Sequence, residues 1–244
     1  MKIKIEYLCP EFCHFYGDHA NLTYISARAE LMGNKVEVVK TIQSQTPLFA
    51  ENQCLMLYIS PTNDVYQKPL IKYLSKYKKE LQTYIDNGGI VLATGNSKEL
   101  FGKFITDFDG NNIEALDMFD ISSTRFRGKR HSYNVLAKYN QNINIAGYKN
   151  LASSCDETKN KYPLFDIIKE KGEQTSTKEG IHYKNFFATH LLGPVLLQNP
   201  LFADEILKLL FKEDFKKIYL PYELLAHEKR FDEILNCTNA DKNG

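Results

Sequence analysis

Hydrophobic and polar positions alternate along residues 2–8, and this spacing predicts a β-strand. Along residues 22–32 the apolar positions recur every three or four residues, which is typical of an amphipathic helix that Gly33 would end. Residues 35–39 predict a second short strand. The continuous apolar run at 55–59 predicts a strand buried on both faces, as in a parallel sheet.

A further helix and strand follow Pro69. Residues 69–84 carry apolar and aromatic side chains at helical spacing, so they predict one long helix that begins at Pro69 and ends at the glycines near residue 88. The apolar strand 90–93 then turns through Gly95 into a second helix, whose first amides Asn96 or Ser97 would cap. This alternation of strands and helices predicts an α/β fold with an open, mostly parallel sheet flanked by helices.

The pattern changes after about residue 111. Residues 122–133, 139–148 and 181–190 predict short strands without long helices between them, and the polar stretch 170–180 predicts an exposed loop or hairpin. A helix is predicted from Asn199 to residue 210, with proline at its first position. Residues 1–212 are therefore expected to form one domain with a strand-rich second half. Residues 213–244 would be a C-terminal extension, with a helix around 223–235 and a polar tail.

Composition and charge exclude several classes of function. The chain has 31 basic and 30 acidic residues, and its net charge of +1 gives no general electrostatic basis for binding nucleic acid. No apolar run reaches the ~20 residues that span a bilayer, and no signal sequence is recognisable at the start. Five cysteines without a disulfide-type spacing suggest reduced thiols. We therefore expect a cytoplasmic protein without a membrane span.

Three segments carry a family resemblance. Residues 90–102, IVLATGNSKELFG, have the strand–turn–helix pattern of a nucleophile elbow. Residues 8–21, LCPEFCHFYGDHAN, and residues 179–207, EGIHYKNFFATHLLGPVLLQNPLFADEIL, are similar to motifs of one family at nearly unbroken spacing. Together the segments resemble class I glutamine amidotransferases of the CobB/CobQ-like branch, and within it the GatD-type glutaminase subunits that act with a MurT-like Mur ligase on the peptidoglycan stem.

The resemblance covers residues of about 1–212 and implies where the family chemistry should lie. In the family a cysteine at the elbow attacks the glutamine amide, a histidine relays the proton, and backbone amides stabilise the oxyanion. The cysteine position falls on Gly95 and the histidine position on Leu192. The oxyanion loop falls on residues 60–67, where Pro61 has no amide proton to donate. The sequence therefore predicts that glutamine is not hydrolysed by the family mechanism.

Ser97 and His190 are weak substitutes for the missing catalytic groups. A hydroxyl at Ser97 would need a general base, and His190 points to the same side of its strand as residue 192. The alternative is that Ser97 caps the helix and that His190 is a half-buried structural residue.

Five further residues are candidates for contacts with a ligand or a partner. Arg125 and Asn63 are candidates for ligand binding. Tyr16, Asp18 and Asn21 belong to the matched opening loop, where they either form a structural turn or face the partner.

The remaining reactive side chains suggest no metal centre. Cys9 and Cys13 lack a familiar zinc spacing and are expected to be packed thiols. Cys155 is expected to be an exposed thiol and Lys149 a solvated replacement for an acid. No metal and no cofactor are expected.

Three functions remain open from the sequence. The first is a catalytically inactive glutaminase-like subunit that forms a heteromer with a MurT-like Mur ligase and supports or regulates it. The second is an active amidotransferase or hydrolase that uses Ser97 and His190. The third is a small-ligand sensor that uses a pocket reshaped by Pro61, Lys149 and Leu192.

Overall fold

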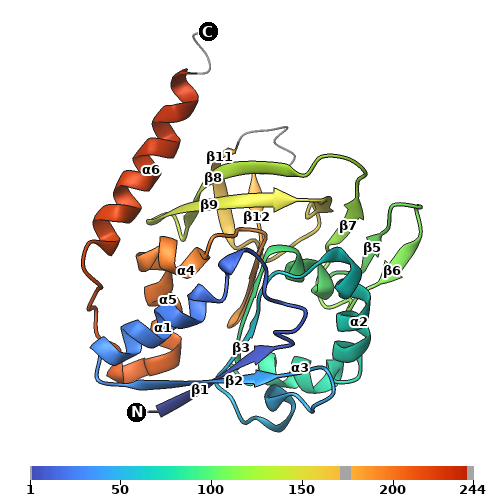
Figure 1. The fold of residues 1–244 in the computed structure, drawn as a ribbon, viewed down its shortest axis with the longest axis horizontal. Helices are drawn as coiled ribbons and strands as arrows, with labels where there is room; N and C mark the ends of the chain where they lie inside the picture. Colours follow the sequence, from blue (N-terminus) through green and yellow to red (C-terminus); the bar gives the residue numbers. More distant parts are fainter. Residues whose placement is uncertain (1, 171–176, 241–244) are drawn as a thin grey trace.

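The computed structural model describes residues 2–170 and 177–240, and its centre is a six-stranded sheet (Figure 1). The strand order is β13-β14-β4-β3-β1-β2, and every neighbouring pair is parallel except β13 and β14. The strands are β1 (Lys2–Leu8), β2 (Lys35–Thr41), β3 (Met56–Ile59), β4 (Ile90–Thr94), β13 (Ile181–Tyr183) and β14 (Phe186–Thr189). The prediction of an open, mostly parallel sheet is confirmed.

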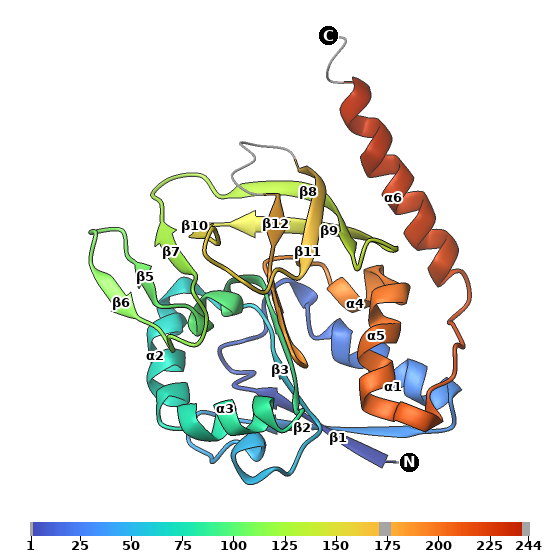
Figure 2. The same cartoon turned by 180° about the vertical axis from the view of Figure 1, so that it is seen from behind.

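Helices cover both faces of this sheet. Figures 1 and 2 show α1, α4 and α5 on one side and α2 and α3 on the other, as expected when successive connections run toward opposite edges of a parallel sheet. The strands β3 and β4 are buried along their whole length, which explains their continuous apolar sequences. The helices are α1 (Ala20–Leu31), α2 (Asp64–Ser75), α3 (Lys78–Asp86), α4 (Val195–Gln198), α5 (Pro200–Phe211) and α6 (Glu223–Ala240). Shorter 3₁₀ helices are Phe15–Gly17, Leu48–Glu51, Gly95–Phe101 and Lys212–Asp214.

The second half of the chain adds two four-stranded sheets, in the orders β10-β7-β5-β6 and β12-β11-β8-β9. Their strands are β5 (Phe104–Thr106), β6 (Asn112–Glu114), β7 (Ser122–Arg125), β8 (His131–Tyr139), β9 (Ile143–Leu151), β10 (Ser153–Asp156), β11 (Phe165–Glu170) and β12 (Lys178–Glu179). A bridge between Tyr148 and Leu192 joins β9 to the segment that follows β14. The added sheets therefore approach the carboxyl edge of the central sheet, where the elbow lies.

The single long helix predicted from Pro69 is wrong. The structure has two helices, α2 and α3, and α2 begins at Asp64. Asn63 is its N-cap, because its side chain accepts a hydrogen bond from the amide of Val65 at 3.1 Å. Pro69 lies inside α2, so its position did not mark the start of the helix.

The helix of the C-terminal extension is present but longer than predicted. α6 continues to Ala240, so residues 236–240 are helical rather than part of a polar tail. Its far end projects beyond the rest of the protein in both views (Figures 1 and 2). Of the loop predicted at 170–180, residues 171–176 lie outside the described part of the chain. None of the helices described is long and apolar enough to cross a membrane.

Candidate functional site

The elbow after β4 places Gly95 at the carboxyl end of a central strand, between β3 and β14. Gly95 has a φ of +61°, a backbone conformation that glycine adopts without the steric cost of a side chain. The 3₁₀ helix Gly95–Phe101 follows directly. The strand–turn–helix geometry of a nucleophile elbow is therefore present, with glycine at its apex.

The three altered positions of the family site meet in space around Gly95. Pro61 follows β3 and Leu192 follows β14, so the ends of the two flanking strands bring both side chains to the elbow. A Cβ atom placed on Gly95 would lie 2.8 Å from Cγ of Pro61 and 2.9 Å from Cδ2 of Leu192. Real Cβ atoms do not approach other atoms so closely. The position of a nucleophilic side chain is therefore filled by a proline ring and a leucine.

Little open space remains at this site. The cavity beside Gly95, which His190 and Ser153 also line, has a volume of about 10 Å³. A polar cavity of this size holds about one water molecule. It has no room for a glutamine side chain.

Ser97 and His190 each have other partners. Ser97 Oγ donates a hydrogen bond to the carbonyl oxygen of Ser60 at 2.7 Å, and His190 Nε2 lies 3.1 Å from Oε1 of Glu99. His190 is buried, so the expectation of a half-buried side chain is wrong. The expected helix cap at the elbow is also wrong, because Asn96 Oδ1 instead accepts a hydrogen bond from the amide of Thr62. The structure does not pair Ser97 with His190.

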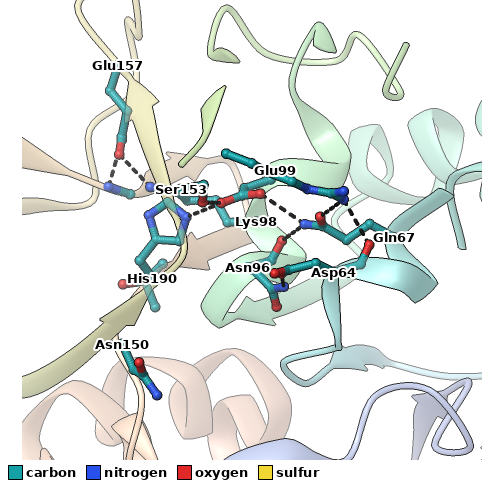
Figure 3. A network of polar contacts seen from close by, with 12 residues as sticks. Asp64, Gln67, Asn96, Lys98, Glu99, Asn150, Ser153, Glu157 and His190 are labelled. Atoms are coloured by element: carbon teal, nitrogen blue, oxygen red, sulfur yellow. Dashed lines mark hydrogen bonds and ion pairs between the residues drawn. The ribbon is translucent and has the colours of Figure 1, made fainter. Parts of the chain in front are cut away.

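A buried polar network surrounds His190 (Figure 3). Glu99 accepts hydrogen bonds from Ser153 and from Gln67 Nε2, the latter at 2.9 Å. Lys98, whose side chain is fully buried, forms ion pairs with Glu157 and with Glu179, the latter at 3.2 Å. We call this set the Lys98 network; its members are Gln67, Lys98, Glu99, Ser153, Glu157, Glu179 and His190.

The charges of the Lys98 network stabilise one another. Burial alone would raise the pKa of Glu99, but the hydrogen bonds from His190, Ser153 and Gln67 outweigh it and hold the pKa below its usual value. Burial would likewise lower the pKa of Lys98, yet the neighbouring carboxylates of Glu157 and Glu179 raise it. Glu99 and Lys98 are therefore ionised at neutral pH. They fasten the 3₁₀ helix of the elbow to β12 and to the segments that follow β10 and β14.

The network also contains the kind of side chains that bind metal ions. Ligand atoms of Glu157, Glu179 and His190 lie within 4.8 Å of one another. The ammonium group of Lys98 contacts both of these carboxylates and supplies the positive charge that a metal ion would otherwise bring. The arrangement fits a structural ion pair better than a metal centre.

The partner-facing role predicted for Asp18 and Asn21 is wrong, because both side chains are fully buried. Asp18 accepts hydrogen bonds from Tyr58 Oη, at 2.9 Å, and from Thr94. Asn21 donates to Tyr58 Oη at 3.1 Å and joins the start of α1 to the same cluster. These residues fasten α1 to β3 and β4. Tyr16 is different: it is 46% exposed.

Arg125 and Asn63 also have partners within the chain. Arg125 Nη2 donates to the carbonyl oxygen of Asp64 at 2.8 Å and to Gln67 Oε1 at 2.7 Å, and Asn63 caps α2. These contacts hold α2 against β7. Their role in ligand binding stays a prediction.

Cys155 and Lys149 are less exposed to solvent than predicted, whereas the predicted burial of Cys9 and Cys13 is confirmed. Cys155 is partly buried and packs against the core, and burial raises the pKa of its thiol to about 12. Lys149 is buried and pairs with Glu170 at 2.9 Å rather than being solvated. Cys9 and Cys13 are fully buried, as predicted for packed thiols.

Comparison with known proteins identifies the family. Residues 4–200 match the CobB/CobQ-like glutamine amidotransferase domain. The chain belongs to this family. The resemblance seen in the three motifs is thus confirmed for most of the chain.

Two GatD proteins are among the relatives of this family member. The GatD subunit of lipid II isoglutaminyl synthase (glutamine-hydrolysing) from Streptococcus pneumoniae is 26% identical over 242 residues, covering 95% of this chain and 90% of that protein. GatD from Staphylococcus aureus is 26% identical over 212 residues, covering 85% of this chain and 84% of that protein. The pneumococcal match extends into residues 213–244, which the three motifs do not reach.

The fold of the family member has a counterpart among solved structures. A glutamine amidotransferase from Thermotoga maritima superposes with a TM-score of 0.50 at 9% identity, covering 96% of this chain and 92% of that one. This similarity supports the class I glutamine amidotransferase fold and carries no information about substrate.

Proposed function

We propose that the chain is a non-catalytic, glutaminase-like subunit that binds a MurT-like Mur ligase and supports or regulates it in cell-wall peptide modification. The two GatD relatives are subunits of lipid II isoglutaminyl synthase, which supports a role in a heteromer of this kind. The observation that carries the proposal is the contact of Pro61 and Leu192 over Gly95, where the family places its nucleophile.

The geometry argues against the two alternatives. Ser97 bonds to a backbone carbonyl and His190 to Glu99, so neither group is placed to activate the other. The cavity beside Gly95, of about 10 Å³, leaves no room for the ligand of a small-molecule sensor. The fold is retained, but Pro61 and Leu192 fill the position of the nucleophile. This combination favours a structural or regulatory role over catalysis.

Glutamine hydrolysis and complex formation should be measured in the same samples. The purified chain is assayed for ammonia release alone and together with the MurT-like ligase of the same cell, and the complex is followed by size-exclusion chromatography with light scattering. We expect a stable complex and no ammonia above buffer. The pneumococcal GatD with its own ligase serves as the positive control.

Two results would contradict the proposal in different ways. Ammonia release that His190→Ala abolishes would establish a displaced catalytic site. Failure to form a complex under conditions where the control pair associates would remove the partner from the proposal.

Gly95→Cys is expected to restore no glutamine hydrolysis and to destabilise the fold. The new Cβ would overlap Pro61 and Leu192, and overpacking of this kind costs about 1–3 kcal/mol. Gly17→Cys is the matched control, because Gly17 has a similar φ of +65° but has open space where its Cβ would lie. Urea unfolding should show Gly95→Cys to be less stable than Gly17→Cys by about that amount.

Leu192→Ala should cost less stability in the Gly95→Cys background than in the wild-type chain, because there it also relieves one of the two overlaps. Equal stability of Gly95→Cys and Gly17→Cys would show that the site is not packed as described.

A further inference from the structure

A second cavity lies at the opposite edge of the central sheet from Gly95. Tyr183 pairs with Phe186 at the start of β14, and Ile85 lies in the last turn of α3, just before β4 begins. The cavity therefore lies near the amino ends of β4 and β14, whereas the elbow follows the carboxyl end of β4. Its volume is about 260 Å³, and it is lined by Gln82, Ile85, Met118, Phe119, Tyr162 and Tyr183.

Three aromatic rings form adjoining walls of this cavity. The rings of Tyr162 and Tyr183 lie 4.9 Å apart at an angle of 60°, and those of Phe119 and Tyr183 lie 6.0 Å apart at 68°. The three rings therefore form walls of the cavity that stand at steep angles to one another. Tyr162 is 43% exposed, so this wall is open to solvent.

One of these rings already attracts a cation of the chain itself. Lys184 Nζ lies 5.4 Å from the centre of the Tyr183 ring and pairs with Asp86 at 2.7 Å. Asp120, which follows the lining residue Phe119 in the chain, pairs with Lys103 at 2.8 Å. Asp86 and Asp120, each next in sequence to a lining residue, are thus paired with lysines.

We infer that this cavity is a binding site for a small organic cation of the quaternary ammonium type. Aromatic faces attract such ions by cation–π interaction, most effectively where several rings converge. None of the six lining side chains is charged, and a quaternary ammonium group donates no hydrogen bonds and so requires no carboxylate. The site is separate from the elbow, and it does not depend on the proposed absence of glutaminase activity.

Choline is the probe for this site, titrated onto the full-length chain while the tyrosine ring resonances are followed by NMR. The expected result is saturable binding in the millimolar range, with the Tyr162 and Tyr183 signals shifting. Dimethylbutanol, the uncharged carbon isostere of choline, should bind more weakly. Equal binding of both probes would overturn the cationic class of ligand, and absence of saturable choline binding would overturn the site.

Substitutions on the surface locate the binding. Tyr162→Ala should weaken choline binding about 2- to 30-fold, the range expected for one cation–π contact. Lys184→Met should strengthen it, because the competing ammonium is removed and Asp86 loses its cationic partner. Tyr222→Ala is the control, since Tyr222 is exposed and is not part of the cavity. Unchanged affinity in both Tyr162→Ala and Lys184→Met would place the ion elsewhere and contradict the inference.

Discussion

Lys98→Met is expected to lower the free energy of unfolding by about 3–5 kcal/mol, the usual cost of removing one partner from a buried ion pair. Methionine preserves most of the side-chain volume, so the loss reports the charge rather than a cavity. Without the ammonium group, Glu157 and Glu179 remain as buried carboxylates close to each other. Lys149 is then the lysine that still acts electrostatically on Glu179.

Chemical denaturation at neutral pH measures this effect. Lys103→Met is the matched control, because Lys103 forms an ion pair with Asp120 whose side chains are 46% and 44% exposed. Exposed pairs contribute about 0–1 kcal/mol, so the control should unfold nearly like the wild type. A loss below about 1 kcal/mol for Lys98→Met would show that the Lys98 network is solvated and does not hold the elbow in place.

The central sheet was predictable because its signals are local. β1, β3 and β4 lie within one residue of the predicted strands. β1 alternates apolar and polar residues, whereas β3 and β4 are the continuous apolar runs of strands buried in a parallel sheet. The start of the first helix between β3 and β4 was misjudged because its local signal is weak. Pro69 is conspicuous in the sequence, whereas the cap that begins α2 is a single hydrogen bond that the side chain of Asn63 accepts from the amide of Val65.

The candidate site was predictable only in part. Family motifs indicate Pro61, Gly95 and Leu192 one by one, but their mutual contact depends on three strand ends meeting at one edge. The Lys98 network could not be foreseen, because Lys98 and its partners are separated by 59 and 81 positions in the sequence. No local pattern records such a pairing.

Asp18 and Asn21 show a different limit of sequence reasoning. Both are polar, and polar side chains usually lie at the surface unless hydrogen-bond partners are supplied. Here Tyr58 of β3 supplies them, from about forty positions further along the chain. The same residues therefore fit a partner surface by sequence and a buried cluster by structure.

The relation between residues 1–212 and the extension 213–244 depends on another buried cation, Arg28 of α1. Its guanidinium group donates to Asp204 of α5 at 2.7 Å and lies 3.3 Å from Glu223, the first residue of α6. It also lies 4.6 Å from the centre of the Tyr219 ring, and Tyr219 bonds to Asp204 at 2.7 Å. Arg28, in the predicted domain, thus contacts both Tyr219 and Glu223 near the start of the extension.

Arg28→Met is therefore expected to cost about 3–5 kcal/mol in urea unfolding, because Asp204 and Glu223 lose a buried positive partner. Lys208→Met is the control, since it breaks an ion pair with Glu205 in which the lysine side chain is 54% exposed.

Hydrogen exchange of Arg28→Met separates two arrangements of the chain. If amides of α5 and α6 lose protection together, the extension and the domain form one cooperative unit. If α6 alone loses protection, residues 213–244 open independently, and the boundary at residue 212 is a physical one. Wild-type stability in Arg28→Met would show that the guanidinium group does not hold the extension.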